Sequence, residues 1–163
     1  MRFAYFDSSA LVKVYAWEGE GSKEVRRMVG QAVLARPTIR IVVCDIALSE
    51  AESAVARKER DREITTAQAE RYLELIRTDF LLREPRPYQI VSASSVVQDA
   101  GGLSRLYGLK SMDAIQLAAA LAVRSALPPG SDFVFVCADG KLCNAAAAEN
   151  FPLHTLPRVE VRR

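Results

Sequence analysis

Short apolar runs alternate with longer amphipathic segments along the chain. Runs rich in Phe, Tyr, Ile and Val, too short to be helices, predict β-strands at residues 2–6, 40–44, 88–91 and 133–137, with a final edge strand at 153–156. Apolar residues at helical spacing predict helices at residues 9–16, 22–35, 46–59, 92–107, 111–127 and 139–149. One more helix is expected from a cap at Thr65 or Thr66 to about residue 82.

Strands that are separated by helices need crossover connections, which are typical of a parallel sheet with helices on both faces. The sequence therefore predicts an α/β fold, a three-layer α/β/α domain with a mostly parallel central sheet. The chain has 163 residues and contains no internal repeat, low-complexity segment or long linker. We expect a single domain over residues 1–163.

The composition is that of an ordinary globular protein, with 50% hydrophobic and 26% charged residues. The net charge of +2 is too small to indicate a protein that coats nucleic acid, although it is compatible with a local basic face. The longest apolar stretches are far too short to span a bilayer, and Asp7 interrupts the first one before a signal-peptide core could form. We expect no membrane partner and a cytoplasmic location.

Cysteine and histidine are scarce. Cys44, Cys137 and Cys143 are an odd number without metal-ligand spacing, and His154 is the sole histidine, which argues against a zinc site. We expect the cysteines to be reduced, and His154 to pack within a short terminal apolar run.

Acidic residues follow the predicted strands. Asp7 directly ends the first strand and Asp139 follows the fourth, so both are expected at the carboxyl edge of the sheet, where ligands bind in such folds. Asp113 falls in the first turn of a helix for which Ser111 is the expected cap, where the helix dipole favours a carboxylate. Glu50 lies about one turn into the helix after the second strand, close enough to reach the same edge.

Several carboxylates at one site raise one another's pKa and need a cation to remain ionised. Ligands that are all oxygen select hard cations, Mg²⁺ or Mn²⁺, which activate water and neutralise charge on a phosphoryl oxygen. No serine has an adjacent histidine, so a covalent nucleophile is not expected. We expect metal-dependent hydrolysis of a phosphate ester, with catalytic and metal-binding residues Asp7, Glu50, Asp113 and Asp139.

Four segments, in this order and spacing, resemble those of the PIN-domain ribonucleases, most closely the VapC-type toxins of toxin–antitoxin pairs. They are residues 5–13 (YFDSSALVK), 50–57 (EAESAVAR), 109–120 (LKSMDAIQLAAA) and 135–142 (FVCADGKL). The resemblance implies that Asp7, Glu50, Asp113 and Asp139 form the family's acidic metal site. It also implies Mg²⁺- or Mn²⁺-dependent endoribonuclease activity that leaves a 5′-phosphate, a homodimer, and inhibition by a small antitoxin whose tail enters the groove.

The chain departs from the family pattern at two cysteines. Cys137 stands two residues before Asp139, where the family usually has Thr or Ser, and Cys44 stands where Ser often precedes the third helix. A thiol is a poorer hydrogen-bond donor than a hydroxyl, so we expect weaker support of Asp139. Asp45, next to Cys44, is expected to cap the third helix.

The acids also have structural interpretations. Asp7 is a suitable helix cap, and Asp113 could simply complement the helix dipole. Asp139 followed by glycine is a common hairpin turn, although the alanine-rich segment that follows is helical in pattern. Glu52 competes with Glu50, because residues two apart lie on different faces of a helix, and the motif spacing favours Glu50.

Basic and aromatic residues supply weaker candidates. Lys13 lies two turns after Asp7 and either holds a substrate phosphate or extends to solvent. The basic run at residues 57–62 is either a solvated helix end or a phosphate contact, with Arg57 and Lys58 as substrate-binding candidates. Asp99 is expected to be a solvated helix residue. Core or dimer contacts, rather than base stacking, are expected for Tyr15, Trp17 and Tyr107.

With the resemblance to PIN-domain ribonucleases, the acidic residues favour an RNA-cleaving hydrolase, and the resemblance implies the role of the toxin of a type II toxin–antitoxin pair. Its expected partners are RNA, a second copy of the chain and an antitoxin, with apolar surface at residues 65–82 available for protein contacts. A catalytically inactive PIN-fold module that binds RNA or protein is the main alternative. A receiver-like signalling domain is a weaker one, since the strands ending in Cys44 and Val91 lack its phospho-accepting aspartate.

Overall fold

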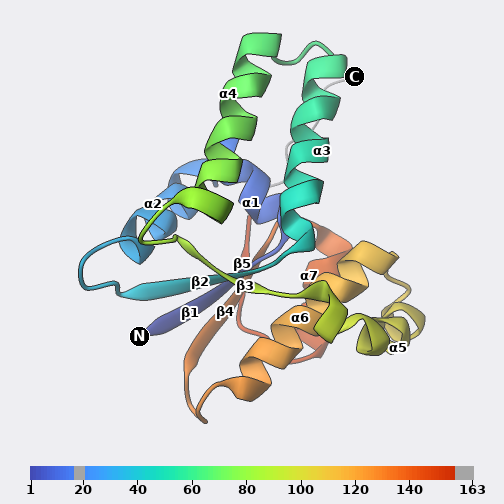
Figure 1. The fold of residues 1–163 in the computed structure, drawn as a ribbon. Coiled ribbons are helices and arrows are strands. Elements are labelled where there is room, and N and C mark those ends of the chain that lie inside the picture. Colours follow the sequence, from blue (N-terminus) through green and yellow to red (C-terminus); the bar gives the residue numbers. More distant parts are fainter. Residues whose placement is uncertain (17–20, 157–163) are drawn as a thin grey trace.

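The computed structural model describes residues 1–16 and 21–156, which form a β-sheet packed against α-helices (Figure 1). Its elements are, in chain order, β1 (Arg2–Phe6), α1 (Ser8–Tyr15), α2 (Ser22–Ala32), β2 (Ile39–Cys44), α3 (Ile46–Arg60), α4 (Thr66–Arg77), the π-helical turn η1 (Thr78–Leu82), β3 (Tyr88–Val91), the 3-10 turn η2 (Ala93–Ser95), α5 (Val97–Tyr107), α6 (Ser111–Ala126), β4 (Asp132–Cys137), α7 (Gly140–Ala148) and β5 (Leu153–Thr155).

The strands form a five-stranded sheet in the order β3-β2-β1-β4-β5, and every pairing in it is parallel. The prediction of an α/β fold with a parallel sheet is therefore confirmed. Each strand lies within one residue of its predicted bounds. The chain moves from β1 through β2 to β3, and then returns to the other side of β1 to add β4 and β5. The direction of strand addition thus reverses between β1 and β4.

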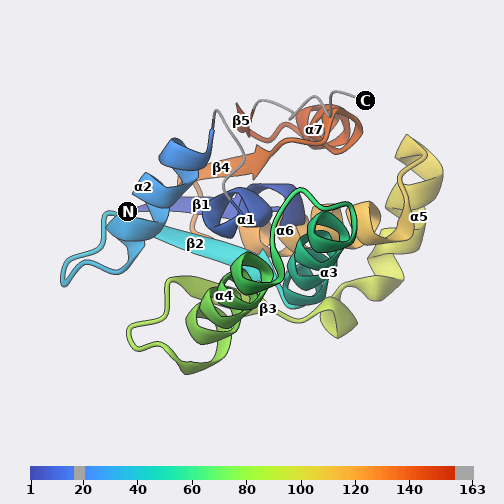
Figure 2. The ribbon, with the colours of Figure 1, turned by 90° about the horizontal axis from the view of Figure 1, so that it is seen from above.

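Helices cover both faces of the sheet (Figures 1 and 2). Because side chains alternate along a strand, Phe6 packs with α1, α2, α3 and α4, whereas Tyr5 packs with α5, α6 and α7. Two apolar cores result, one on each side of the sheet, and the predicted three-layer α/β/α arrangement is confirmed.

Three predicted helices differ from the structure by more than one residue at an end or are divided. The second ends at Ala32 rather than residue 35, since the following Leu34 is exposed and adds no buried contact. The helix predicted to reach residue 82 ends as an α-helix at Arg77 and continues as η1, which buries Phe80. The segment predicted as one helix from residue 92 is divided into η2 and α5.

Helix capping differs from the prediction at two positions. Asp45 precedes α3, but its carboxylate accepts hydrogen bonds from Ser92 Oγ at 3.0 Å and from the backbone N–H of Ala93 at 2.9 Å. The predicted capping bond is thus wrong, because the end of β3 supplies better-placed donors. Lys110 rather than Ser111 is the N-cap residue of α6. Thr65 caps α4 as predicted.

The helices α3 and α4 project together beyond the sheet (Figure 1). Only the first turns of α3 lie beside the carboxyl edge of the strands, and its last turn, with Arg57 and Lys58, lies at the outer end of this projection. Among residues 1–16 and 21–156, no helix is both long and apolar enough to cross a membrane.

The close approach of α6 to the sheet depends on small side chains, including the fully buried Ala120. Replacement Ala120→Leu should lower the free energy of unfolding by about 1–3 kcal/mol, because the added atoms have no space in a packed core. Urea denaturation would measure this, with Ala122→Leu at an exposed position of the same helix as the control. Equal stability of the two variants would contradict this description of the packing.

Candidate active site

Asp7 stands at the carboxyl end of the central strand β1 and is only 3% exposed. Its Oδ1 accepts a hydrogen bond of 2.8 Å from the backbone N–H of Ala10, so Asp7 does cap α1. Ser9 Oγ lies 2.7 and 2.8 Å from the two carboxylate oxygens. The same Ser9 oxygen accepts the backbone N–H of Ala138 at 2.8 Å. Asp7 therefore caps α1 and at the same time lies at the carboxyl edge of the sheet.

Asp139 follows β4, the strand on the opposite side of the reversal from β1, at whose end Asp7 lies. The residues next to Asp139 in the chain follow β4, which pairs with β1 in register Phe6 to Val136. Its Oδ1 accepts the backbone N–H groups of Lys141 and Leu142 at 2.8 and 3.0 Å and caps α7. A helix and not a returning strand follows, so the hairpin interpretation is wrong. Crevices at such reversal points are the usual ligand sites of open parallel sheets.

Glu50 points toward the same edge from α3. It accepts hydrogen bonds from Ser8 Oγ and, at 2.9 Å, from Gln116 Nε2. Glu52 instead pairs with Arg77 of α4 at 2.6 Å. The expectation that only one of the two glutamates faces the sheet edge is confirmed, and Glu50 is the one.

A buried polar network behind Glu50 was not predicted from the sequence. Tyr5 is fully buried, and its hydroxyl donates to Gln116 Oε1 at 2.6 Å. The Gln116 amide donates to Glu50 and, at 2.7 Å, to Ser8 Oγ. The signal available in the sequence was the position of Gln116, a polar residue one turn after Asp113 within an apolar run.

Asp113 is in the first turn of α6, as predicted, and is half-buried. Burial raises its pKa above the ordinary value, and the charges of Asp139 and Glu50 raise it further. Lys110 and Lys141 act in the opposite direction. Asp113 therefore lies within electrostatic range of two other candidate acids from two other elements.

The pKa of Asp7 is raised from 3.8 to about 7, chiefly by burial. The hydrogen bonds from Ala10 and Ser9 oppose this shift, and the charge of Glu50 adds to it. The fold thus places the four acids near one edge of the sheet, where Glu50 acts electrostatically on Asp7 and both Glu50 and Asp139 act on Asp113.

The chemistry of this donor set fits a hard divalent cation, because every candidate ligand atom is a carboxylate oxygen and like charges disfavour ionisation without a counter-ion. In the described part of the chain, however, no three Asp, Glu, His or Cys side chains lie close enough together to hold a metal ion. Three of the carboxylates are held by neighbouring donors: Asp7 by Ser9 and Ala10, Glu50 by Ser8 and Gln116, and Asp139 by the backbone N–H groups of Lys141 and Leu142.

The expectation of reduced cysteines is wrong for two of them. Cys137 and Cys143 form a disulfide with their Cα atoms 6.4 Å apart, whereas Cys44 is free and buried. The tight connection from β4 into α7 brings the two sulfur atoms together, which their separation of six residues does not indicate by itself. The disulfide spans Asp139, whose carboxylate accepts backbone N–H groups, so the thiol donor expected at Cys137 is not part of its support.

The substrate-binding candidates lie elsewhere. Lys13 is 2% exposed, so the alternative that it extends to solvent is wrong. Lys58 pairs with Glu63 at 2.8 Å near the outer end of α3, and Arg57 lies on the same turn. A phosphate contact by Lys13, Arg57 or Lys58 stays a prediction.

The other residues considered have mainly structural contacts. Tyr15 is buried and its hydroxyl interacts with Tyr88 and Asp79, which confirms the core placement. Tyr107 donates to Glu149, and Asp99 is exposed on α5, as expected. His154 lies half-buried in β5, and Trp17 is outside the described residues.

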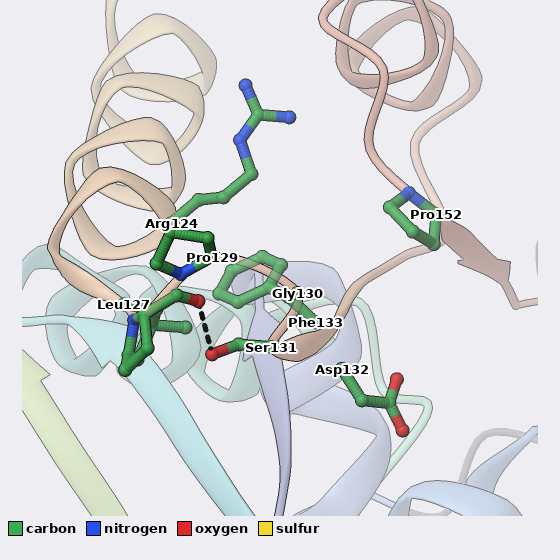
Figure 3. A pocket seen from close by; sticks show the side chains of 9 residues that line it. Arg124, Leu127, Pro129, Gly130, Ser131, Asp132, Phe133 and Pro152 are labelled. Carbon is green, nitrogen blue, oxygen red and sulfur yellow. Dashed lines mark hydrogen bonds between the residues drawn. The ribbon is translucent and has the colours of Figure 1, made fainter.

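A pocket of about 340 Å³ lies at the opposite, amino-terminal end of β4 (Figure 3). Arg124, Phe133 and Pro152 are among its lining residues. Arg124 is already engaged, since it donates to the carbonyl of Glu149 at 2.7 Å and stacks on the ring of Phe151. This pocket is therefore separate from the acidic edge and does not add to its chemistry.

No protein-family model matches the chain, and no curated protein matches it.

The network behind Glu50 can be tested through stability. Replacement Gln116→Leu removes the acceptor of the buried Tyr5 hydroxyl and should lower the free energy of unfolding by about 1–3 kcal/mol. Adding Tyr5→Phe should recover part of this loss, because no buried hydroxyl remains. Denaturant unfolding of both single variants and the double variant would give the coupling energy, and strictly additive effects would contradict the network.

The raised pKa of Asp7 predicts a pH dependence of stability in metal-free buffer. The folded state retains the proton up to about pH 7, whereas the unfolded state releases it near 3.8. Stability that is present at lower pH is therefore lost as the pH rises through this interval, by an amount on the order of a few kcal/mol. Asp7→Asn keeps the cap oxygen and removes the titration.

The stability of Asp7→Asn relative to the unmodified protein should thus increase from pH 4 to pH 7 and then become constant. Urea unfolding in the presence of a chelator would measure it. The control is Asp99→Asn, at an exposed acid. A stability difference for Asp7→Asn that does not vary with pH would refute the buried-carboxylate description.

Proposed function

We propose that the protein is a metal-dependent endoribonuclease of the PIN type. The observation that carries this proposal is the position of Asp7 at the end of β1 and of Asp139 after β4, on the two sides of the strand reversal, with Glu50 of α3 hydrogen-bonded to Ser8 next to Asp7. This is the edge at which open parallel sheets bind ligands, and the all-carboxylate chemistry is the one that hydrolysis of a phosphodiester with Mg²⁺ or Mn²⁺ requires.

We propose that Asp7, Glu50 and Asp113 would hold the catalytic cation, with Asp139 completing the site or holding a second ion. Binding an ion in this way requires the carboxylates to move closer together, because no three of them lie close enough among the described residues. When bound, Mg²⁺ or Mn²⁺ supplies a lowered pKa for the attacking water and compensates charge on the phosphoryl oxygens. Following the resemblance to PIN-domain ribonucleases, the cut leaves a 5′-phosphate.

The surrounding polar groups orient the carboxylates. Ser9 holds both oxygens of Asp7, and Gln116, itself fixed by Tyr5, holds Glu50 from behind. These contacts restrict side-chain rotation before substrate arrives, which lowers the entropic cost of assembling the site. The fully buried position of Tyr5 makes it a support for Gln116 rather than a group that meets substrate.

The proposal extends to the role of a toxin in a toxin–antitoxin pair, acting in the cytoplasm as a homodimer. Support for protein contacts comes from α4 and η1, where Leu75, Leu81 and Leu82 are 44%, 55% and 76% exposed. Exposed leucines on neighbouring turns are typical of surfaces that bind another protein.

A catalytically inactive module with the same fold is the second candidate. It is favoured by the separation of the acids, which do not form a closed metal cage among the described residues. A receiver-like role has less support, because the strand order of this sheet is 3-2-1-4-5, whereas the usual order of the receiver fold is 2-1-3-4-5.

The decisive experiment compares Asp113→Asn with Asp99→Asn. Both replace an aspartate in the first turn of a helix on the same face of the sheet, but only Asp113 faces other acids. Labelled RNA incubated with Mn²⁺ should be cleaved by the unmodified protein and by Asp99→Asn, and at least 100-fold more slowly by Asp113→Asn. A chelator should abolish all cleavage.

Thermal unfolding provides the readout that does not need the right RNA. Millimolar Mn²⁺ should raise the melting temperature of the unmodified protein and of Asp99→Asn, and the shift should be smaller in Asp113→Asn. A Mn²⁺ shift without cleavage of any RNA tested would favour the inactive module. The absence of any Mn²⁺ shift would reject the metal site.

A further inference from the structure

Two lysines lie beside the acidic edge, although neither belongs to the basic residues singled out in the sequence. Lys110 is the N-cap residue of α6, three residues before Asp113, and Lys141 is in the first turn of α7, two residues after Asp139. Both side chains are exposed. Each lysine is therefore within three residues of one candidate ligand and accessible to a molecule that approaches this edge.

A hydrogen bond holds the side chain of Lys141 against the segment that leads into Lys110. The ammonium group of Lys141 donates to the carbonyl oxygen of Gly108, the left-handed residue that ends α5. Gly108 is two residues before Lys110, so the ammonium group of Lys141 is held at the turn on which Lys110 stands. A side chain at position 108 would crowd this contact, since an added Cβ would lie 3.3 Å from the Lys141 nitrogen.

The two lysines bring positive charge to an edge that carries acidic groups. Both act on Asp113 in the direction opposite to Glu50 and Asp139, so both ammonium groups lie within electrostatic range of the candidate acids. Carboxylates alone would repel a polyanion, and positive charge beside them favours the approach of a phosphate group.

We propose that Lys110 and Lys141 bind the RNA backbone phosphate next to the scissile bond, an inference that rests on the proposed nuclease function. The two ammonium groups remain available to a phosphate because both side chains are exposed, and an ammonium group has three donors of which the carbonyl of Gly108 takes one from Lys141. Lys13, by contrast, is buried, and Lys58 is paired with Glu63 at a distance from the acids.

The test uses Lys110→Gln, Lys141→Gln and the double variant. Glutamine removes the charge but keeps an N–H donor, so a purely structural contact is disturbed less than by alanine. The matched control is Lys23→Gln, which replaces an exposed lysine in the first turn of α2. In Figure 2, α2 lies on the left and α5 and α7 lie on the right.

Steady-state cleavage of a labelled single-stranded RNA with Mn²⁺ should show a KM raised severalfold in each lysine variant, with kcat changed by less than about twofold, because the contact binds ground and transition states alike. The slope of log(kcat/KM) against log salt concentration should become shallower by about 0.7 for each lysine removed. Lys23→Gln should leave both quantities unchanged.

A titration with Mn²⁺ monitored by thermal unfolding separates phosphate binding from a structural role. If the lysines bind substrate, their removal should leave the Mn²⁺ requirement unchanged or lower it, since a competing positive charge is lost. A higher Mn²⁺ requirement together with a fall in kcat would overturn the proposal, because it would show that the lysines position Asp113 and do not bind the substrate. Variants that match Lys23→Gln in KM and salt slope would overturn it as well.

Fluorescence anisotropy with the same RNA in Ca²⁺ measures binding without cleavage. Weaker binding by Lys110→Gln and Lys141→Gln than by Lys23→Gln supports the phosphate contact, and equal binding rejects it. An unmodified protein that binds RNA but never cleaves it would reject the nuclease function instead, so the two failures are distinguishable.

Discussion

The hydroxyl group of Ser9 connects the two halves of the acidic edge. It lies at hydrogen-bond distance from both oxygens of Asp7 and accepts the backbone N–H of Ala138. Ala138 directly precedes Asp139, so one side chain joins the end of β1 to the turn that leaves β4. Strand addition reverses between β1 and β4, so these two strand ends form the crevice at the carboxyl edge. The carboxylates that α3 and α6 contribute can lie beside Asp7 and Asp139 only if the ends of β1 and β4 keep a fixed relative position.

Helix capping and ligand placement use the same aspartates. The capping bonds of Asp7 and Asp139 both go to Oδ1, and a carboxylate has about four lone-pair sites, so capping leaves acceptor capacity in each group. Capping also orders the side chain without any ligand. A role as a helix cap therefore does not exclude a role as a ligand for Asp7 or Asp139, and capping fixes the side chain in the position from which it would bind.

The sequence predicted those features that depend on local pattern. The strands and most helices follow from alternation and helical spacing, and the approach of Asp7 to the β4 end follows from parallel pairing. Features that depend on contacts between distant segments were missed. Tyr5 and Gln116 are 111 residues apart, and Asp45 reaches Ala93 across 48 residues, so no local pattern could pair them. The same reason explains why Lys13 was not recognised as buried.

Burial of charge is the strongest physical argument that the acidic edge is more than a set of caps. Serine or asparagine would cap α1 about as well as Asp7 without a carboxylate to desolvate. Instead, Asp7 is buried beside Glu50, and its pKa rises to about 7, which makes its ionised form costly at neutral pH. Asp113 has the same tendency between Glu50 and Asp139. A bound divalent cation would offset this cost, whereas without one the cost is avoided only while these carboxyl groups stay protonated.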